Sequence, residues 1–444
     1  MKSYLRIFVE FVCPLAFVIA LIFSASSCSS SAKSEPAAAV VASVPKPCAL
    51  ALAAQSGTTA LDQEIVRWQQ KARSEKKDQA NMSLERLGWK YIEKARATYD
   101  PGYFKLAEAC AECLSAQNSA TLPEALLLRG HALHQMHNFK AAEPIARELV
   151  KTRGLAFDHG LLGDVLMEQG KLKEAIAAYQ KMMNQKPSLQ AYSRAAHVRW
   201  LTGDIVGAAE MALLAAQSGS PQDRETSAWA YTRLALYQWQ LGKNEMAQQA
   251  LNTALELQSD YAPALLVQGR MLLAEEKFAA AIAPLKQATA LNPLPEYQWT
   301  LADALRRAGN NDEAIKVETQ LTTKGAQDDP RTLSLYLATR NESADQALRL
   351  AQTELEARAD VFTYDALAWA LRAVGKTTEA QDAMKKALAE GTRDARLFYH
   401  AGVIAAQTNH QAEAQRYFKQ AYSSRQLLLP SEREDLNRQM AAIR

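Results

Sequence analysis

Two pairs of side chains with redox or metal-binding character stand out in this sequence. Cys110 and Cys113 have the two-residue gap of thiol redox and zinc sites, and His131 and His134 are three apart, which puts both imidazoles on one helical face. The cysteine pair falls inside a helical segment, not at the helix N-terminus that would stabilise a thiolate. The 17-residue gap between the pairs is not that of a zinc finger. We expect no bound metal, with His131 and His134 as the weak candidates, and assign the cysteines to packing or a disulfide.

Enzyme signatures are missing from the sequence. It has no strand followed by a glycine-rich nucleotide loop, no Gly-x-Ser-x-Gly elbow and no His-Glu-x-x-His helix. We therefore predict a protein that is not an enzyme, that needs no cofactor and that has no small-molecule substrate.

The composition is that of packed helices. Hydrophobic residues make up 48% of the 444, charged residues 22% and aromatic residues 7%. The formal net charge is +3, and the sequence has no block of five or more Lys and Arg residues. We expect no nucleic-acid partner, because nucleic-acid binding depends on concentrated positive charge.

Residues 1–27 have the pattern of an export signal. Lys2 and Arg6 precede an apolar run from Phe11 to Phe23, and small residues follow. The run is short for a bilayer span of about 20 residues. A cleaved signal and an uncleaved membrane anchor both remain open.

The segment Ala25-Ser26-Ser27-Cys28 resembles the lipidation site of bacterial lipoproteins, with Ala25 in place of the preferred Leu. The resemblance implies lipidation, for example palmitate, at Cys28; the alternative is a plain secretory signal. Residues 28–60, rich in Ser, Ala and Pro, are predicted to be a flexible tether. The expected location is extracytoplasmic, in the cell envelope, as a membrane-anchored lipoprotein facing the periplasm if Cys28 is lipidated.

The rest of the chain repeats itself with a period of 33–34 residues. An alanine recurs with steps of 35, 33, 33, 39, 34, 33, 33, 33 and 34 residues. Twelve residues before it, nine units have Gly or Ala, with Leu335 as the exception, and glycine often lies five residues before it. Small residues at two fixed places let paired helices approach closely. The repeated alanines are Ala107, Ala142, Ala175, Ala208, Ala247, Ala281, Ala314, Ala347, Ala380 and Ala414.

This pattern resembles the tetratricopeptide repeat over about residues 80–424. The third unit reads Leu162-Gly163-x-x-Leu166, then Gly170-Lys171-x-x-Glu174-Ala175-x-x-x-Tyr179. The resemblance implies an all-α, right-handed superhelical solenoid of about ten helix-turn-helix repeats. We assign residues 61–424 to the array, with a break near 218–223 where the step is 39 residues. Leu61, Ile65 and Trp68 are expected to cap its first end.

The last residues, 425–444, are expected to form a C-terminal capping helix. Ser431 and Glu434 have capping-box spacing. Leu436, Met440 and Ile443 then follow at helical spacing and would cover the exposed apolar face of the tenth unit.

By resemblance, certain positions of each first helix line the concave groove. Trp and Arg at such positions suit binding hot spots, whereas filling of the core is the alternative for the tryptophans. The predicted groove residues are Trp89, His131, His134, His197, Trp200, Trp229, Trp239, Arg270, Trp299, Asp303, Arg306, Asp365, Trp369, Arg372 and Tyr399.

The family also has a form in which groove Lys and Asn hold a C-terminal carboxylate. The corresponding positions are Leu127 and His131 in unit two and Gly160 and Asp164 in unit three, so this form is not expected.

The predicted function is capture of a peptide or protein partner in the groove. One alternative is a scaffold of an envelope assembly that uses convex or end surfaces. The other is an accessory or maturation factor for a metalloenzyme that uses His131 and His134.

Overall fold

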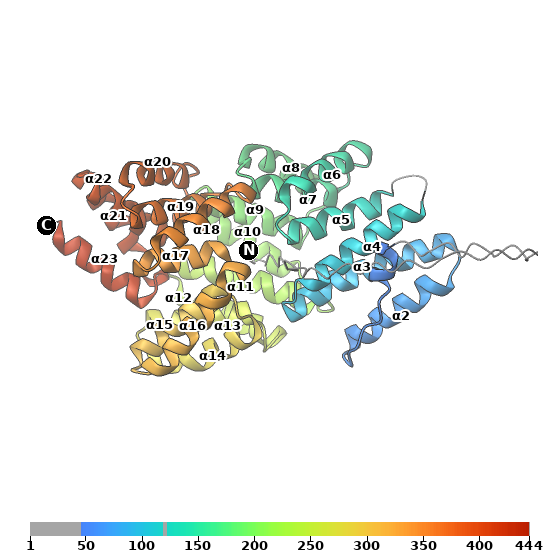
Figure 1. Ribbon diagram of the computed structural model, residues 1–444, viewed down its shortest axis with the longest axis horizontal. Coiled ribbons are helices and arrows are strands. Elements are labelled where there is room, and N and C mark those ends of the chain that lie inside the picture. The colour runs from blue at the N-terminus through green and yellow to red at the C-terminus, as the bar shows by residue number, and fades with distance from the viewer. Residues whose placement is uncertain (1–45, 119–121, 444) are drawn as a thin grey trace, which may run out of the picture.

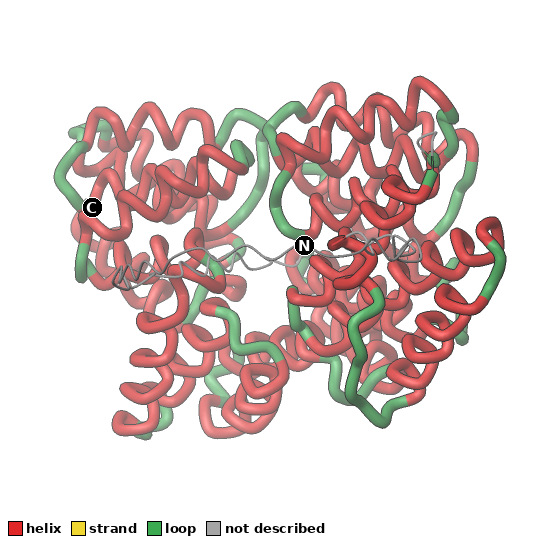
Figure 2. Tube along the Cα trace, turned by 45° about the vertical axis from the view of Figure 1, so that its right-hand side comes forward, coloured by secondary structure: helices red, strands yellow, loops and turns green. Residues whose placement is uncertain are grey.

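The computed structural model describes residues 46–118 and 122–443. These ranges contain 23 α-helices and one 3-10 helix, and no β-strand occurs in them (Figure 1, Figure 2). None of these helices is both long and apolar enough for a bilayer span. The predicted signal 1–27 and Cys28 lie outside the described residues.

Twenty helices form ten antiparallel hairpins, so the predicted all-α solenoid is confirmed. The first helices of the hairpins, called A helices, are α3 (Lys77–Thr98), α5 (Pro123–Gln135), α7 (Ala156–Glu168), α9 (Leu189–Leu201), α11 (Arg224–Gln240), α13 (Ala262–Ala274), α15 (Pro295–Arg307), α17 (Pro330–Arg340), α19 (Val361–Ala373) and α21 (Ala395–Gln407). The second, called B helices, are α4 (Gly102–Gln117), α6 (Phe139–Thr152), α8 (Leu172–Gln185), α10 (Ile205–Gln217), α12 (Asn244–Leu257), α14 (Phe278–Leu291), α16 (Asn311–Asp328), α18 (Ala344–Ala357), α20 (Thr377–Ala387) and α22 (Gln411–Ser423).

Small residues bring the two helices of a hairpin together. All ten repeated alanines have 0% exposure. A Cβ added to Gly163 would lie 2.3 Å from the Tyr179 ring, and one added to Gly402 would lie 2.4 Å from the Phe418 ring. In these hairpins a large B-helix ring therefore fills the space over a bare A-helix backbone.

The first end of the array is covered by two further helices. In α2 (Ala60–Ser74), Ile65 is buried in the core of the first hairpin, and Leu61 and Trp68 pack beside it. Helix α1 (Lys46–Ala51) packs on α4 and buries Cys48 and Ala51. The predicted flexible tether over 28–60 is therefore wrong for residues 46–51, because these residues bury apolar side chains.

The long step near 218–223 does not interrupt the core. Ala212 and Ala216 of α10 share a cluster of buried side chains with Ala228 and Ala230 of α11. Helix α11 has 17 residues, whereas most A helices have 13, so part of the insertion lengthens a helix. The break considered for this place is absent from the described structure.

The C-terminal segment forms a 3-10 helix (Arg425–Leu427) and α23 (Pro430–Ala442). Leu436 is fully buried, and Met440 and Ile443 pack on a core that includes Phe418. The predicted capping box at Ser431 and Glu434 is wrong. Helix α23 begins one residue earlier than that spacing assumes, so the Glu432 carboxylate accepts from the Leu429 backbone N–H at 2.9 Å.

The array also coils back on itself, so that its third and fourth hairpins touch its ninth and tenth. The backbone N–H of Ala359 donates to the Glu168 carbonyl at 3.1 Å, and the Thr392 hydroxyl donates to the Leu201 carbonyl at 2.6 Å. In Figure 1, α18 and α19 accordingly lie across α9 and α10. We call this contact, between residues 168–203 and residues 358–393, the clasp.

Side chains reinforce the clasp. The buried Arg358 guanidinium lies 2.7 Å from the buried Glu168 carboxylate, and the rings of Trp200 and Phe362 stack with centroids 5.6 Å apart. The superhelix is therefore closed across its middle, and its concave face becomes the wall of an interior.

Candidate binding clefts

Every predicted groove residue except Trp89 lines one of three clefts on the interior face. The histidine cleft is lined by His131, His134, His197 and Trp229. The central cavity is lined by His197, Trp200, Trp229, Trp239, Arg270, Trp299 and Asp365. The C-terminal cleft is lined by Trp299, Asp303, Arg306, Trp369, Arg372 and Tyr399. Trp89 lies beside the histidine cleft, with its ring centroid 5.4 Å from that of His131.

The histidine cleft has a volume of about 300 Å³. Consecutive A helices, α5, α7, α9 and α11, supply most of its wall, as expected for the concave face of a repeat array. Phe139 and Trp229 add aromatic surface, and Arg358 reaches it from the clasp. The cleft combines apolar surface with several charged groups.

Its histidines are neutral at physiological pH. Burial, aided by the neighbouring His134 and by arginine charges, lowers the pKa of His131 to about 3. Burial lowers the pKa of His134 to about 4, against the attraction of Asp164. Burial and the Arg233 charge also hold the pKa of His197 well below its ordinary value. These side chains therefore offer hydrogen bonds, not positive charge.

Most charges in the histidine cleft are already paired. Arg194 donates to Asp164 from Nε at 2.8 Å and from Nη2 at 2.5 Å, and the Tyr179 hydroxyl donates to the same carboxylate at 2.9 Å. Although burial opposes ionisation, the Arg194 charge keeps the pKa of Asp164 below its ordinary value. Asp164 thus has little capacity left for a ligand.

The central cavity, about 370 Å³, lies between the two arms that the clasp joins. Trp200 donates from Nε1 to the Gln240 side chain at 2.8 Å and stacks on Phe362 from the opposite arm. Asp365 is held by the His400 ring, with 2.8 Å between Oδ1 and Nδ1. The cavity is therefore walled by aromatic rings whose positions depend on the clasp.

Acidic side chains at the central cavity serve as helix caps. Asp329, Asp360 and Asp394 precede α17, α19 and α21 and accept from backbone N–H groups of the first turns, at 3.1, 2.7 and 2.9–3.1 Å. Such caps satisfy N–H groups that would otherwise lack partners. The acidity of this cavity has a structural cause, so it does not by itself indicate a cationic ligand.

The C-terminal cleft, about 630 Å³, is built around a cation–aromatic pair. The Arg372 guanidinium lies 3.9 Å from the centre of the Trp369 ring and donates to the Ala338 carbonyl at 3.0 Å. Trp369 donates to the Thr339 hydroxyl at 2.9 Å. Arg306 pairs with Glu318.

The C-terminal segment engages several predicted groove residues. Arg270 donates to the Leu427 carbonyl at 2.6 Å. Asp303 accepts from the Ser431 backbone N–H at 3.2 Å, and the Tyr399 hydroxyl donates to Asp435 at 2.6 Å. These three side chains hold the chain's own terminus and are not free for a partner in this arrangement.

The tryptophans divide into two groups. Trp239, Trp299 and Trp369 are only 3%, 6% and 2% exposed, so they belong to the core as well as to the cleft walls. Trp200 and Trp229 are half-buried. The half-buried rings have more surface to offer to a partner.

Sequence reasoning missed polar residues of the histidine cleft. Ser193 lies at a groove position of its unit but is small and polar, so it attracted no attention. Arg233 lies two residues before the small Ala235, one place beyond the groove positions of the repeat. Its spacing of four from Trp229 would have placed both on one face of α11.

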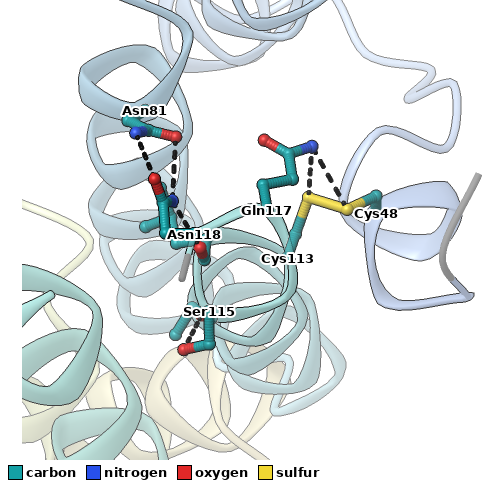
Figure 3. The surroundings of a disulfide bond; sticks show 8 residues. Cys48, Asn81, Cys113, Ser115, Gln117 and Asn118 are labelled. Carbon is teal, nitrogen blue, oxygen red and sulfur yellow. Dashed lines mark hydrogen bonds between the residues drawn. A yellow bond between two sulfur atoms is a disulfide. The ribbon is translucent and has the colours of Figure 1, made fainter. Parts of the chain in front are cut away.

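The metal and cysteine predictions meet different outcomes. The described residues contain no group of three or more His, Cys, Asp or Glu side chains able to hold a metal. Cys113 forms a disulfide with Cys48, which ties α1 to α4 (Figure 3). Cys110 is a buried free thiol, and burial raises its pKa. The partner of Cys113 comes from the segment that was predicted to be a tether.

Comparison with known proteins supports the repeat assignment. The family described as "Tetratricopeptide repeat" matches residues 127–189, 232–294 and 272–329. No curated protein matches the chain. The chain thus contains tetratricopeptide repeats, and proteins with such repeats are known for binding other proteins.

Solved structures also resemble parts of the chain. PilF of Pseudomonas aeruginosa has 16% identity and a TM-score of 0.39, over 45% of this chain and 90% of its own. Yeast Tom70 has 14% identity and a TM-score of 0.33, over 86% of this chain and 96% of its own. Similarity at this level says nothing about a shared partner.

Proposed function

We propose that this chain is an exported protein that captures a segment of a protein partner on the interior face of its tetratricopeptide array. The observation that carries the proposal is the convergence of Trp, His and Arg side chains from successive A helices on three neighbouring clefts. Such residues bury large areas at little cost in conformational entropy, as binding hot spots require. No catalytic role is proposed.

The free interior surface favours the first half of the array. The C-terminal segment already contacts Arg270, Asp303 and Tyr399, whereas Trp229 and the histidine cleft have no such cover from it. We therefore place partner capture at the histidine cleft and the adjoining side of the central cavity.

Export is supported by the disulfide as well as by the leader. Cys48 and Cys113 are paired across 65 residues, and structural disulfides persist mainly outside the reducing cytosol. Lipidation of Cys28 would hold the array at the periplasmic face of a membrane. Because α1 is tied to α4, residues 28–45 are the segment available to connect that anchor to the array.

The groove is tested with Trp229→Leu, which removes a half-buried ring from two clefts. Trp68→Leu is the matched control, because Trp68 is also half-buried but lines none of the three clefts. Tagged proteins are used to capture partners from envelope extract, and a captured protein is then titrated directly. We expect Trp229→Leu to weaken its binding at least tenfold and Trp68→Leu to leave it unchanged. Equal binding by all three proteins, with unchanged melting temperatures, would contradict the groove proposal.

The anchor is tested by fractionation after labelling with a palmitate analogue. We expect the wild-type chain to carry the label and to sediment with membranes, and Cys28→Ser to lose the label. Cys13→Ser is the control, since that residue lies in the predicted leader. An unlabelled wild-type chain would reject lipidation while leaving secretion open.

One observation favours the scaffold alternative. On the outer surface, Val206 and Leu213 of α10 are 55% and 41% exposed, and Met246 of α12 is 48% exposed. Exposed apolar side chains on adjoining outer helices can serve as an assembly surface. If Val206→Ser with Leu213→Ser abolished assembly while Trp229→Leu did not, the convex surface would be the functional one.

A further inference from the structure

The histidine cleft contains hydrogen-bonding atoms that the protein itself does not satisfy. The Ser193 hydroxyl and His134 Nε2 are both buried and have no hydrogen-bond partner within the described structure. The Gln135 side-chain amide lies 3.2 Å from His134 Nδ1. When that amide NH₂ donates to Nδ1, the proton of the neutral ring resides on Nε2. Both unsatisfied groups then act as donors.

The same cleft contains one arginine without an acidic partner. Arg194 pairs with Asp164, Arg96 lies 3.4 Å from Glu225, and Arg358 lies 2.7 Å from Glu168. Arg233 lines the cleft with them, but its recorded contacts are only with Tyr237: it donates to the hydroxyl at 2.7 Å and lies 5.0 Å from the ring centre. No carboxylate among the described residues lies within ion-pairing distance of it. With neutral histidines, Arg233 is the excess positive charge of the cleft.

Unused donors and an unpaired cation call for the opposite chemistry in a ligand. An unsatisfied buried donor costs about 1–3 kcal/mol, so a ligand that supplies acceptor oxygens gains that amount. The aromatic faces of Trp229 and Phe139 favour a ligand that is also apolar. A basic ligand is disfavoured, because Asp164 is occupied by Arg194 and Tyr179.

We infer that the occupant of the histidine cleft is an acidic peptide segment of the partner. A Glu or Asp carboxylate pairs with Arg233, acceptor oxygens of the same segment receive hydrogen bonds from Ser193 and His134, and a neighbouring apolar side chain packs on Trp229. This inference rests on the proposed function and specifies the partner chemically. It requires an internal acidic side chain, not a free chain end, and it uses none of the clamp positions considered for this family.

The test uses pools of N-acetylated, C-amidated hexapeptides, so that no terminal carboxylate is present. The third residue is Glu in one pool and Gln in its twin, with apolar residues at the other positions. The full chain is immobilised, and retained peptides are quantified by mass spectrometry. We expect at least tenfold greater retention of the Glu pool, reduced to the Gln level by Arg233→Gln and partly restored in Arg233→Lys.

Matched variants separate local chemistry from loss of folding. Ser193→Ala should weaken retention of the Glu pool severalfold. Arg199→Gln should leave it unchanged, because Arg199 lies on the same helix as Ser193 but is exposed, pairs with Asp204 and does not line the cleft. Equal retention of the Glu and Gln pools by the wild-type chain would overturn the inference, as would unchanged retention by a folded Arg233→Gln variant.

Two further outcomes separate this inference from its premise. If both pools are retained equally and both are lost in Trp229→Leu, the groove captures peptides but does not select acidic ones. If 3-phenylpropanoate binds at micromolar concentration while neither pool does, the carboxylate comes from a small molecule and the peptide inference fails.

Discussion

Histidines that are buried without charge make single residues of this protein sensitive to pH. The pKa values of His131 and His134 are lowered to about 3 and 4, mainly by burial. Below the ordinary histidine pKa near 6.5, the unfolded chain takes up protons that the folded chain refuses. The stabilisation is therefore complete above about pH 6.5 and declines as the pH falls toward 4.

We predict that His134→Gln reduces this sensitivity. The free energy of unfolding of the wild-type chain should fall between pH 7 and pH 5, with a contribution of about 1–2 kcal/mol from His134. The variant should lose less over the same interval, as measured by urea titration at each pH. His410→Gln, at an exposed position, is the control and should follow the wild type. Identical pH dependence of all three proteins would show that His134 is protonated in the folded state.

At the same scale, the sequence identified the packing residues well and the polar residues poorly. The repeated alanines could be found because one packing contact recurs ten times. Leu335 departs from the small-residue pattern, and four residues after Ala347 lies Ala351, where units three, six and ten have Tyr179, Leu285 and Phe418. Ser193 and Arg233 could not be found in this way, because each occurs once and matters only through its neighbours in space.

At the scale of elements, α1 depends on one covalent link. Its six residues bury Cys48 and Ala51, and Cys48 is bonded to Cys113 in α4. So short a helix is not stable alone in water. The sequence gave no sign of this helix, because six residues are too few for a helical pattern and disulfide partners cannot be deduced from sequence alone.

We predict that Cys48→Ala releases α1 and lowers the free energy of unfolding by about 2–4 kcal/mol. Hydrogen exchange should show loss of protection in residues 46–51 and retained protection in α5 to α22. Cys110→Ala is the matched control, because it removes a buried thiol without breaking the disulfide. Protection of 46–51 that survives in Cys48→Ala would mean that packing alone holds the helix.

The start of α23 gives a second prediction for an element. Glu432 is 1% exposed, accepts from the Leu429 backbone N–H at 2.9 Å and pairs with Arg396 at 2.6 Å, whereas Glu434 pairs with Arg307 at the surface. Glu432→Ala should cost about 3–5 kcal/mol, because it leaves a buried arginine unpaired. Glu434→Ala should cost at most about 1 kcal/mol. Chemical denaturation measures both, and a larger loss in Glu434→Ala would restore the capping box that the sequence suggested.

At the scale of the whole molecule, the hairpins and their order could be predicted, but the closure of the array could not. Each hairpin follows from contacts within about 34 residues, which leave a periodic trace in the sequence. The clasp joins residues about 190 positions apart and uses backbone groups, as in the bond from Thr392 to the Leu201 carbonyl. Backbone groups leave no mark on the residue types.

Two turn glycines have a second role in this closure. A Cβ on Gly170 would lie 2.4 Å from the Ala359 carbonyl oxygen, and a Cβ on Gly203 would lie 2.6 Å from the Gly391 carbonyl oxygen. Gly242 and Gly309 have the same left-handed backbone conformation, but a Cβ there would meet no atom within 4 Å. The four positions therefore separate backbone strain from contact across the clasp.

We predict that Gly242→Ala and Gly309→Ala each cost about 1 kcal/mol, because alanine disfavours the left-handed region. Gly170→Ala and Gly203→Ala should cost at least twice as much, and small-angle X-ray scattering should show an increased radius of gyration for them alone. Equal losses and equal radii for all four variants would show that the clasp is not closed in solution.

The clasp also bears on how the molecule unfolds. In an open solenoid each hairpin touches only its neighbours, so stability is a sum of local terms and the ends can fray independently. Here Ala359 and Thr392 tie late hairpins to early ones, so fraying from the C-terminal end must first break contacts in the middle of the chain. The hairpins between the two sides of the clasp should therefore melt together as one cooperative unit. Their assembly should be slower than that of an open array of equal length, because those contacts close a long loop.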